Sequence, residues 1–177
     1  MKRCLSYLLL WLLPVVALAQ DIAVDITDGD GYRYVRTAGA VIYDDYFHTA
    51  RFALAAVVPP DGAESYQLEA TYDEGFLQLG RGDTLELVLR GGDRIYLTAL
   101  ADLTRADVVK RHYRDHNDYL ITVRYGLDIG QLRRLYETKT TKCVLHLRGG
   151  GTVEHRIDLF QRNFSRLLTD LRRRLSA

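Results

Sequence analysis

The chain has 177 residues, with 24 Lys and Arg against 23 Asp and Glu, and a formal net charge of +1. A chain this close to neutral lacks the basic footprint of nucleic-acid binding, so we expect no nucleic-acid partner. Of its two cysteines, Cys4 falls within a predicted export signal, and Cys143 would remain alone after cleavage. The exported part can therefore form no internal disulfide.

The first 19 residues have the pattern of an export signal. Two basic residues, Lys2 and Arg3, precede an apolar run over 5–19, and a small-x-small cleavage site follows at 17–19. The apolar run is fifteen residues long, shorter than the roughly 20 of a membrane-spanning helix. We therefore expect cleavage before Gln20 and export to the periplasm or outside the cell.

The exported part, residues 20–177, is expected to form one domain, because it is long enough to bury a substantial core. Without the signal, Lys plus Arg falls from 24 to 22 while Asp plus Glu stays at 23, so its net charge is −1. No later segment is apolar enough to span a membrane.

Alternation of apolar and polar residues predicts strands along the first half of the chain. The turn 59–62, with sequence PPDG, separates two of the longer ones. The predicted strands are 21–26, 32–36, 40–43, 47–58, 65–72 and a short 76–79.

The stretch 84–100 predicts a hairpin around Gly91 and Gly92. A two-residue loop would place the leucine face of one strand against the polar face of the other. A three-residue loop over 91–93 makes one face wholly apolar, and we expect this register because a slip of one residue exchanges the faces. It pairs Leu89 with Ile95, Leu87 with Leu97, and Leu85 with Ala99.

The segment 102–117 fits two structures. Thr104 and Asp107 could form a capping box for a helix, whereas alternation at Val109, Arg111 and Tyr113 favours a strand with a polar loop. We favour the strand and leave the helix open. A clearer strand follows at 118–125.

Helical spacing appears in two places. Asp128 and Gln131 form a capping box at the start of a short helix over 128–137. An apolar stripe with period 3.6 predicts a C-terminal helix over 160–175, docked on the sheet rather than lying on a membrane. Between them, 142–148 and 153–159 predict a second hairpin.

These patterns predict a mainly-β (α+β) domain, an antiparallel sandwich or a strongly curled, barrel-like sheet with two helices packed on it. The run LELVLRGGDRIYL, the DIGQLRRL helix, and a strand pair followed by a final helix resemble uncharacterised exported bacterial β-rich proteins over roughly 80–175. The resemblance implies no activity, cofactor or site residue.

Two constellations could carry chemistry. His112 and His116, beside two aspartates, could ligate zinc or iron, but we favour a solvated polar loop because so short a pattern is weak evidence for a metal. Cys143 could be a nucleophile with His155 as its base, since pairing Leu147 with Val153 would place His155 diagonal to Cys143. A strand Cys between leucines is more often a buried filler, so we expect no metal, cofactor or catalytic residue.

Tyrosines and arginines gather between residues 32 and 46, and both residue types are enriched in binding hot spots. The binding residues that we predict there are Tyr32, Arg33, Tyr34, Arg36, Tyr43 and Tyr46. Tyrosines are also ordinary in half-buried strands.

The expected function is therefore a non-catalytic binding or assembly module of the cell envelope, whose partner is an unknown protein or envelope component. Two alternatives stay open. One is a metal-dependent or thiol hydrolase, and the other is a structural domain that associates with copies of itself through an exposed strand edge.

Overall fold

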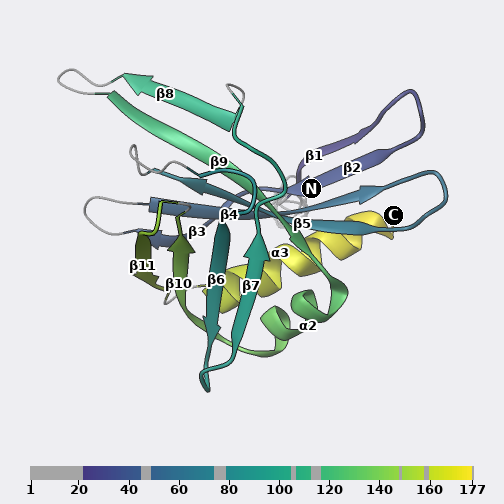
Figure 1. The fold of residues 1–177 in the computed structure, drawn as a ribbon. Helices are drawn as coiled ribbons and strands as arrows, with labels where there is room; N and C mark the ends of the chain where they lie inside the picture. Colours follow the sequence, from purple (N-terminus) through teal and green to yellow (C-terminus); the bar gives the residue numbers. More distant parts are fainter. Residues whose placement is uncertain are drawn as a thin grey trace, which may run out of the picture.

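The structure, a computed structural model, describes residues 22–44, 49–73, 79–104, 107–112, 117–147, 149–157 and 160–176. The predicted mainly-β class is confirmed, with strands β1 to β11 and helices α2 and α3 in these ranges. The strands form two antiparallel sheets around one core (Figure 1). The predicted export signal and the short strand at 76–79 lie outside the described residues, apart from Leu79.

The larger sheet has seven strands and curls into a half-barrel (Figure 1). Its order is β1-β2-β4-β5-β9-β8, and β3 pairs with β4 outside this path. Their bounds are β1 (Ile22–Thr27), β2 (Arg33–Thr37), β3 (Ala40–Asp44), β4 (Thr49–Val58), β5 (Ser65–Tyr72), β8 (Val108–His112) and β9 (Asn117–Leu127).

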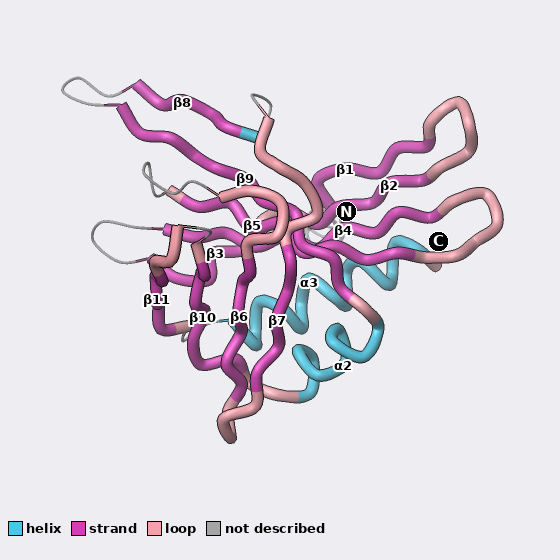
Figure 2. The backbone as a smooth tube through the Cα atoms, in the orientation of Figure 1, coloured by secondary structure: helices cyan, strands magenta, loops and turns pink. Residues whose placement is uncertain are grey.

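The second sheet has four strands in the order β11-β10-β6-β7. Its members are β6 (Thr84–Leu89), β7 (Arg94–Thr98), β10 (Thr140–His146) and β11 (Thr152–Arg156). A bridge between Ala99 and Tyr125 links the end of β7 to β9, so the two sheets meet at β9. The loop that connects β7 with β8 then passes beside β9 (Figure 2).

Both predicted helices form. The short helix α2 (Ile129–Glu137) starts at the predicted capping box. The Gln131 backbone N donates to the Asp128 side chain, and the Gln131 side chain accepts from the Asp128 backbone N. Two side chains of α2 also reach the free edge of β7. Gln131 Nε2 donates to the Tyr96 carbonyl at 3.2 Å, and Arg134 Nη2 donates to the Arg94 carbonyl at 3.3 Å.

The C-terminal helix α3 (Phe160–Leu175) lies against β2, β3 and β4 and closes the core (Figure 1). Its stripe is buried as predicted, with Phe164, Leu167, Leu168 and Leu171 each at most 2% exposed. The stripe is therefore used in packing the domain. Within the ranges given above, neither helix is both long enough and apolar enough to cross a membrane.

Both predicted hairpins form, but each register was wrong by two residues. In the first, Leu87 pairs with Ile95, and Leu89 N donates to Asp93 O at 2.7 Å, so the loop is 90–92. The glycines at 91 and 92 have φ of +102° and +97°, which glycine adopts without a Cβ clash.

The expected register would have placed Arg90 opposite Arg94, an unfavourable like-charge pair. A two-residue shift keeps the apolar face.

The second hairpin has the same shift. Leu145, rather than Leu147, pairs with Val153, and Leu147 N donates to Gly151 O at 2.9 Å. In the segment 102–117, the favoured strand interpretation is confirmed over β8. The Asp107 carboxylate still accepts from the Thr104 amide at 2.8 Å, as a capping box requires, but the chain continues as a strand.

Candidate functional site

The outer face of the seven-stranded sheet is unusual at its central strand. Along β4, Phe52 and Leu54 point into the core, while Ala53 and Ala55 lie on the opposite face and are also buried. A strand that is buried on both faces must be covered on its outer side. Longer polar side chains of neighbouring strands provide this cover.

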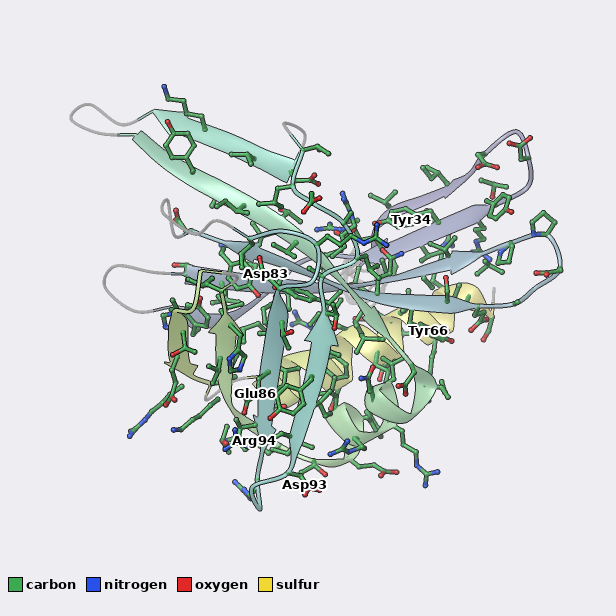
Figure 3. The ribbon with its side chains drawn as sticks, viewed as in Figure 1. Tyr34, Tyr66, Asp83, Glu86, Asp93 and Arg94 are labelled. Carbon is green, nitrogen blue, oxygen red and sulfur yellow. The ribbon has the colours of Figure 1, made fainter. Side chains whose placement is uncertain are left out.

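Glu69 on β5 is the centre of that polar layer. It lies in register between Ala53 on β4 and Arg124 on β9, and its side chain is only 5% exposed. Glu69 Oε1 accepts from Tyr34 Oη at 2.7 Å and from Arg124 Nε at 3.3 Å. Its Oε2 accepts from Arg36 Nε. Side chains of β2, β5 and β9 thus meet over the alanines of β4, and Tyr34 lies near this crossing in Figure 3.

Two opposing effects set the ionisation of Glu69. Burial alone would raise its pKa, but hydrogen bonds from Tyr34 and Arg36, with the charges of Arg36 and Arg124, outweigh burial and hold the pKa below its ordinary value. Burial and the hydrogen bond to Glu69 raise the pKa of Tyr34. Tyr34 therefore stays a neutral donor to an ionised carboxylate.

Asp107 extends this network toward the loop before β8. Its carboxylate accepts from the Thr104 amide at 2.8 Å and the Thr104 hydroxyl at 2.6 Å, while Arg124 Nη1 donates to its other oxygen at 2.9 Å. Hydrogen bonds from Thr104, reinforced by Arg124, lower the pKa of Asp107. Arg124 is thus fixed between two ionised carboxylates, although its side chain is 49% exposed.

A cleft of about 350 Å³ opens beside Arg124. This volume lies at the lower end of the range for small-molecule sites. Its lining comes from β5, β9 and the loop that follows β7: Gln67, Leu100, Ala101, Asp102, Leu103, Thr104, Asp107, Thr122, Val123 and Arg124.

Two side chains in the cleft keep free hydrogen-bonding capacity. Gln67 is half-buried, and its amide bonds to no other side chain or backbone group in the described ranges. Arg124 donates to Glu69 and Asp107 through Nε and Nη1. Its Nη2 bonds to no other group in the described ranges. The cleft therefore presents an unused donor on Arg124, which Glu69 and Asp107 hold in position, and an unused donor and acceptor on Gln67.

Backbone and glycine contacts hold the loop that forms one wall of the cleft. Leu100 N donates to the Arg124 carbonyl at 2.9 Å, and Arg81 N donates to Asp102 Oδ1 at 2.8 Å. A Cβ added at Gly80 would lie 2.8 Å from Asp102 Oδ1, and one at Gly126 would lie 3.2 Å from Leu100. The wall therefore depends on small residues beneath it.

The predicted tyrosine–arginine cluster is divided between the two faces of β2. Tyr34 and Arg36 lie together on the outer face beside Glu69. Arg33 lies on the opposite face, where it forms an ion pair with Asp25 at 3.0 Å and donates to the Arg174 carbonyl of α3. Tyr34 and Arg36 therefore belong to the candidate site, and Arg33 instead ties β1 and β2 to the end of α3.

The other predicted binding residues lie apart from these. Tyr32 is 47% exposed in the turn before β2, and its amide donates to the Asp28 side chain. Tyr43 is buried on β3 and stacks on His155, with 4.0 Å between the ring centroids. Tyr46 lies outside the described residues.

Cys143 and His155 are directly opposite each other on β10 and β11, not diagonal as predicted. Cys143 is fully buried, so its thiol is inaccessible to a substrate approaching from solvent. His116 and the side chain of His112 lie outside what is described. Within the described part of the chain, no group of three or more His, Cys, Asp and Glu side chains could hold a metal.

A second ionic cluster occupies the outer face of the four-stranded sheet (Figure 3). The buried Glu86 carboxylate pairs with Arg94 Nη1 at 2.5 Å and with His146 Nε2 at 2.6 Å. The contact to Arg94 is a pair of opposite charges on neighbouring strands, β6 and β7.

Glu69, Arg124 and Gln67 were missed by sequence reasoning. Their strands were predicted correctly, but outward polar residues on a strand ordinarily face solvent. A signal exists in the run FALAA over 52–56, which is apolar at every position and indicates burial on both faces. A polar residue on a strand that pairs with such a run is a candidate for a buried network.

No protein-family model, curated protein or solved structure matches the chain.

Proposed function

We propose that the protein is an exported, non-catalytic binding module of the cell envelope. Its recognition surface is the outer face of the seven-stranded sheet, at the cleft between Gln67 and Arg124. One observation carries this proposal. The half-exposed Arg124 guanidinium is fixed by Glu69 and Asp107, yet its Nη2 and the neighbouring Gln67 amide remain available to a ligand.

Two features favour a binding role for this surface over a purely structural one. A fixed polar group loses little conformational freedom when it contacts a ligand, so its hydrogen bonds contribute more to affinity. Tyr34 and Arg36, both residue types common in binding hot spots, extend the same face beyond the cleft. The burial of Cys143 argues against the thiol-hydrolase alternative.

The test is an NMR titration of ¹⁵N-labelled protein that begins at Gln20. The probes are glycan, peptide and protein fractions of a cell-envelope extract. We expect one fraction to shift amide signals within 65–72, 100–104 and 122–124. The Gln67→Met variant should reduce these shifts, whereas Lys142→Met, on the other sheet, should preserve them. Shifts confined to other surfaces, or none with any fraction, would reject the proposal.

Export has its own test. Mass spectrometry of the exported product should find a chain that begins at Gln20. An intact segment 1–19 in that product would contradict cleavage, and the same chain found only inside cells would contradict export.

Self-association has one observation in its favour. The end strand β8 exposes Val109 by 54% and Val108 by 36%. If copies associate through β8, sedimentation should show a dimer that Val109→Lys abolishes. A monomer at high concentration would exclude this second function.

A further inference from the structure

We propose that the cleft beside Arg124 takes a neutral saccharide, an inference that rests on the proposed binding function and names its ligand class. Three properties of the lining lead to this class: its charge, the shape of its hydrogen-bonding groups, and its size.

The charge of the lining disfavours anions. Asp102 and Asp107 contribute two negative charges and Arg124 contributes one positive charge. Arg124 also lies against Glu69, so its charge is already balanced by two carboxylates. A ligand carboxylate or phosphate would meet more negative than positive charge, and like charges brought together at a binding surface oppose binding.

The polar groups of the lining suit hydroxyls. The Gln67 side-chain amide offers one donor group and one acceptor, Arg124 offers the N–H groups of Nη2, and Asp102 offers one carboxylate oxygen. Together these donors and acceptors can engage neighbouring hydroxyls on a sugar ring, because each hydroxyl both donates and accepts. Asp102 Oδ1 accepts from Arg81 N, and Oδ2 has no hydrogen-bond partner among the described residues.

The size and apolar part of the cleft fit one ring. About 350 Å³ is the liquid volume of roughly a dozen water molecules, which is enough room for one hexose ring, because its twelve bonded heavy atoms pack more closely than separate waters. Leu100 and Leu103 offer an apolar wall for the C–H groups of the ring. The described lining contains no aromatic ring for stacking, so we expect affinity in the millimolar range.

The test is an NMR titration of the chain beginning at Gln20 with four pure probes. They are a neutral hexose disaccharide, a disaccharide of N-acetylated amino sugars, a uronic-acid disaccharide and an N-acetyl-dialanine amide. We expect at least one neutral disaccharide to shift the amides of 100–104 and 122–124. The uronic-acid probe should bind at least tenfold more weakly.

Variants then connect binding to the cleft. Gln67→Met keeps the side-chain length and removes the amide, so we expect about tenfold weaker saccharide binding with an unchanged melting temperature. Lys142→Met is the matched surface control and should bind as the unaltered chain does.

The outcomes separate this inference from the proposed function. Binding of the peptide amide or the uronic acid in preference to both neutral disaccharides would overturn the saccharide class and keep a binding cleft. If the saccharide shifts the amide signals of Gln67→Met as much as those of the unaltered chain, the sugar binds elsewhere. That result would also overturn the saccharide proposal for this cleft. If neither these probes nor the envelope fractions shift cleft amides, both proposals fail.

Discussion

Glu69 and Arg124 face each other across β5 and β9, and Arg124 Nε donates to Glu69 Oε1 at 3.3 Å. This pair connects the middle of the seven-stranded sheet to the loop that forms the wall of the cleft, because Arg124 also contacts Asp107. A change in the ionisation of either carboxylate should therefore affect both the stability of the sheet and the position of that wall.

The first prediction concerns acid. The pKa of Glu69 lies below its ordinary 4.5, and those of Asp25 and Asp107 lie below 3.8. A lowered pKa in the folded state means that stabilisation is complete above the ordinary pKa and is lost as pH falls through the folded-state pKa. The melting temperature should therefore drop as pH falls below these ordinary values.

A Glu69→Gln variant tests the source of this pH dependence. The amide should lower stability at neutral pH by about 1–3 kcal/mol, because Arg36 and Arg124 lose an ionised partner. Its stability should then fall less steeply with acid than that of the unaltered protein. Equal acid dependence in the two proteins, measured by thermal melts across the pH range, would assign the effect to other carboxylates.

The second prediction concerns α3. Leu171 is fully buried, so Leu171→Ala should cost about 2–5 kcal/mol and Leu171→Asp should cost more, because it places a charge in the core. Arg173→Ala, on the exposed face, should change stability by less than about 0.5 kcal/mol. Urea unfolding measures all three. An unchanged midpoint for Leu171→Asp would mean that α3 does not pack as described.

The third prediction concerns the wall of the cleft. Gly80→Ala should push Asp102 away, because the new methyl group would lie 2.8 Å from its Oδ1 atom. We expect faster hydrogen exchange across 100–104. Gly29→Ala is the matched control, since a Cβ there would meet nothing within 4 Å. Equal exchange in the two variants would show that the wall does not depend on Gly80.

The fourth prediction concerns Cys143, the single thiol of the chain that begins at Gln20. Because the side chain is fully buried, a thiol reagent such as a chromogenic aromatic disulfide should react only after denaturation. Rapid modification of the native protein, or a hydrolytic activity that Cys143→Ala abolishes, would revive the hydrolase alternative.

Local patterns predicted the elements well because each depends on residues close together in the chain. The capping box of Asp128 and Gln131 formed as expected, and so did the stripe of α3. The hairpin registers failed by two residues because alternation fixes only which face a residue occupies. The expected register would have placed Arg90 opposite Arg94, and alternation does not weigh such a like-charge pair.

The candidate site was harder to predict because its residues come from strands far apart in sequence. Tyr34 and Arg36 were predicted as binding residues, but their partner Glu69 lies more than thirty positions later and Arg124 more than fifty beyond that. Strand order decides that these side chains meet, and the sequence alone does not fix the order of strands in an antiparallel sheet.

The contacts of α2 with β7 limit how the four-stranded sheet can grow. An edge strand recruits another strand through its unpaired carbonyl and amide groups. On β7, the carbonyls of Tyr96 and Arg94 already accept from Gln131 and Arg134. An incoming chain would have to displace both side chains before it could add to this edge. Helix α2 thus hinders the addition of further strands, and so β-polymerisation, at the edge of β7.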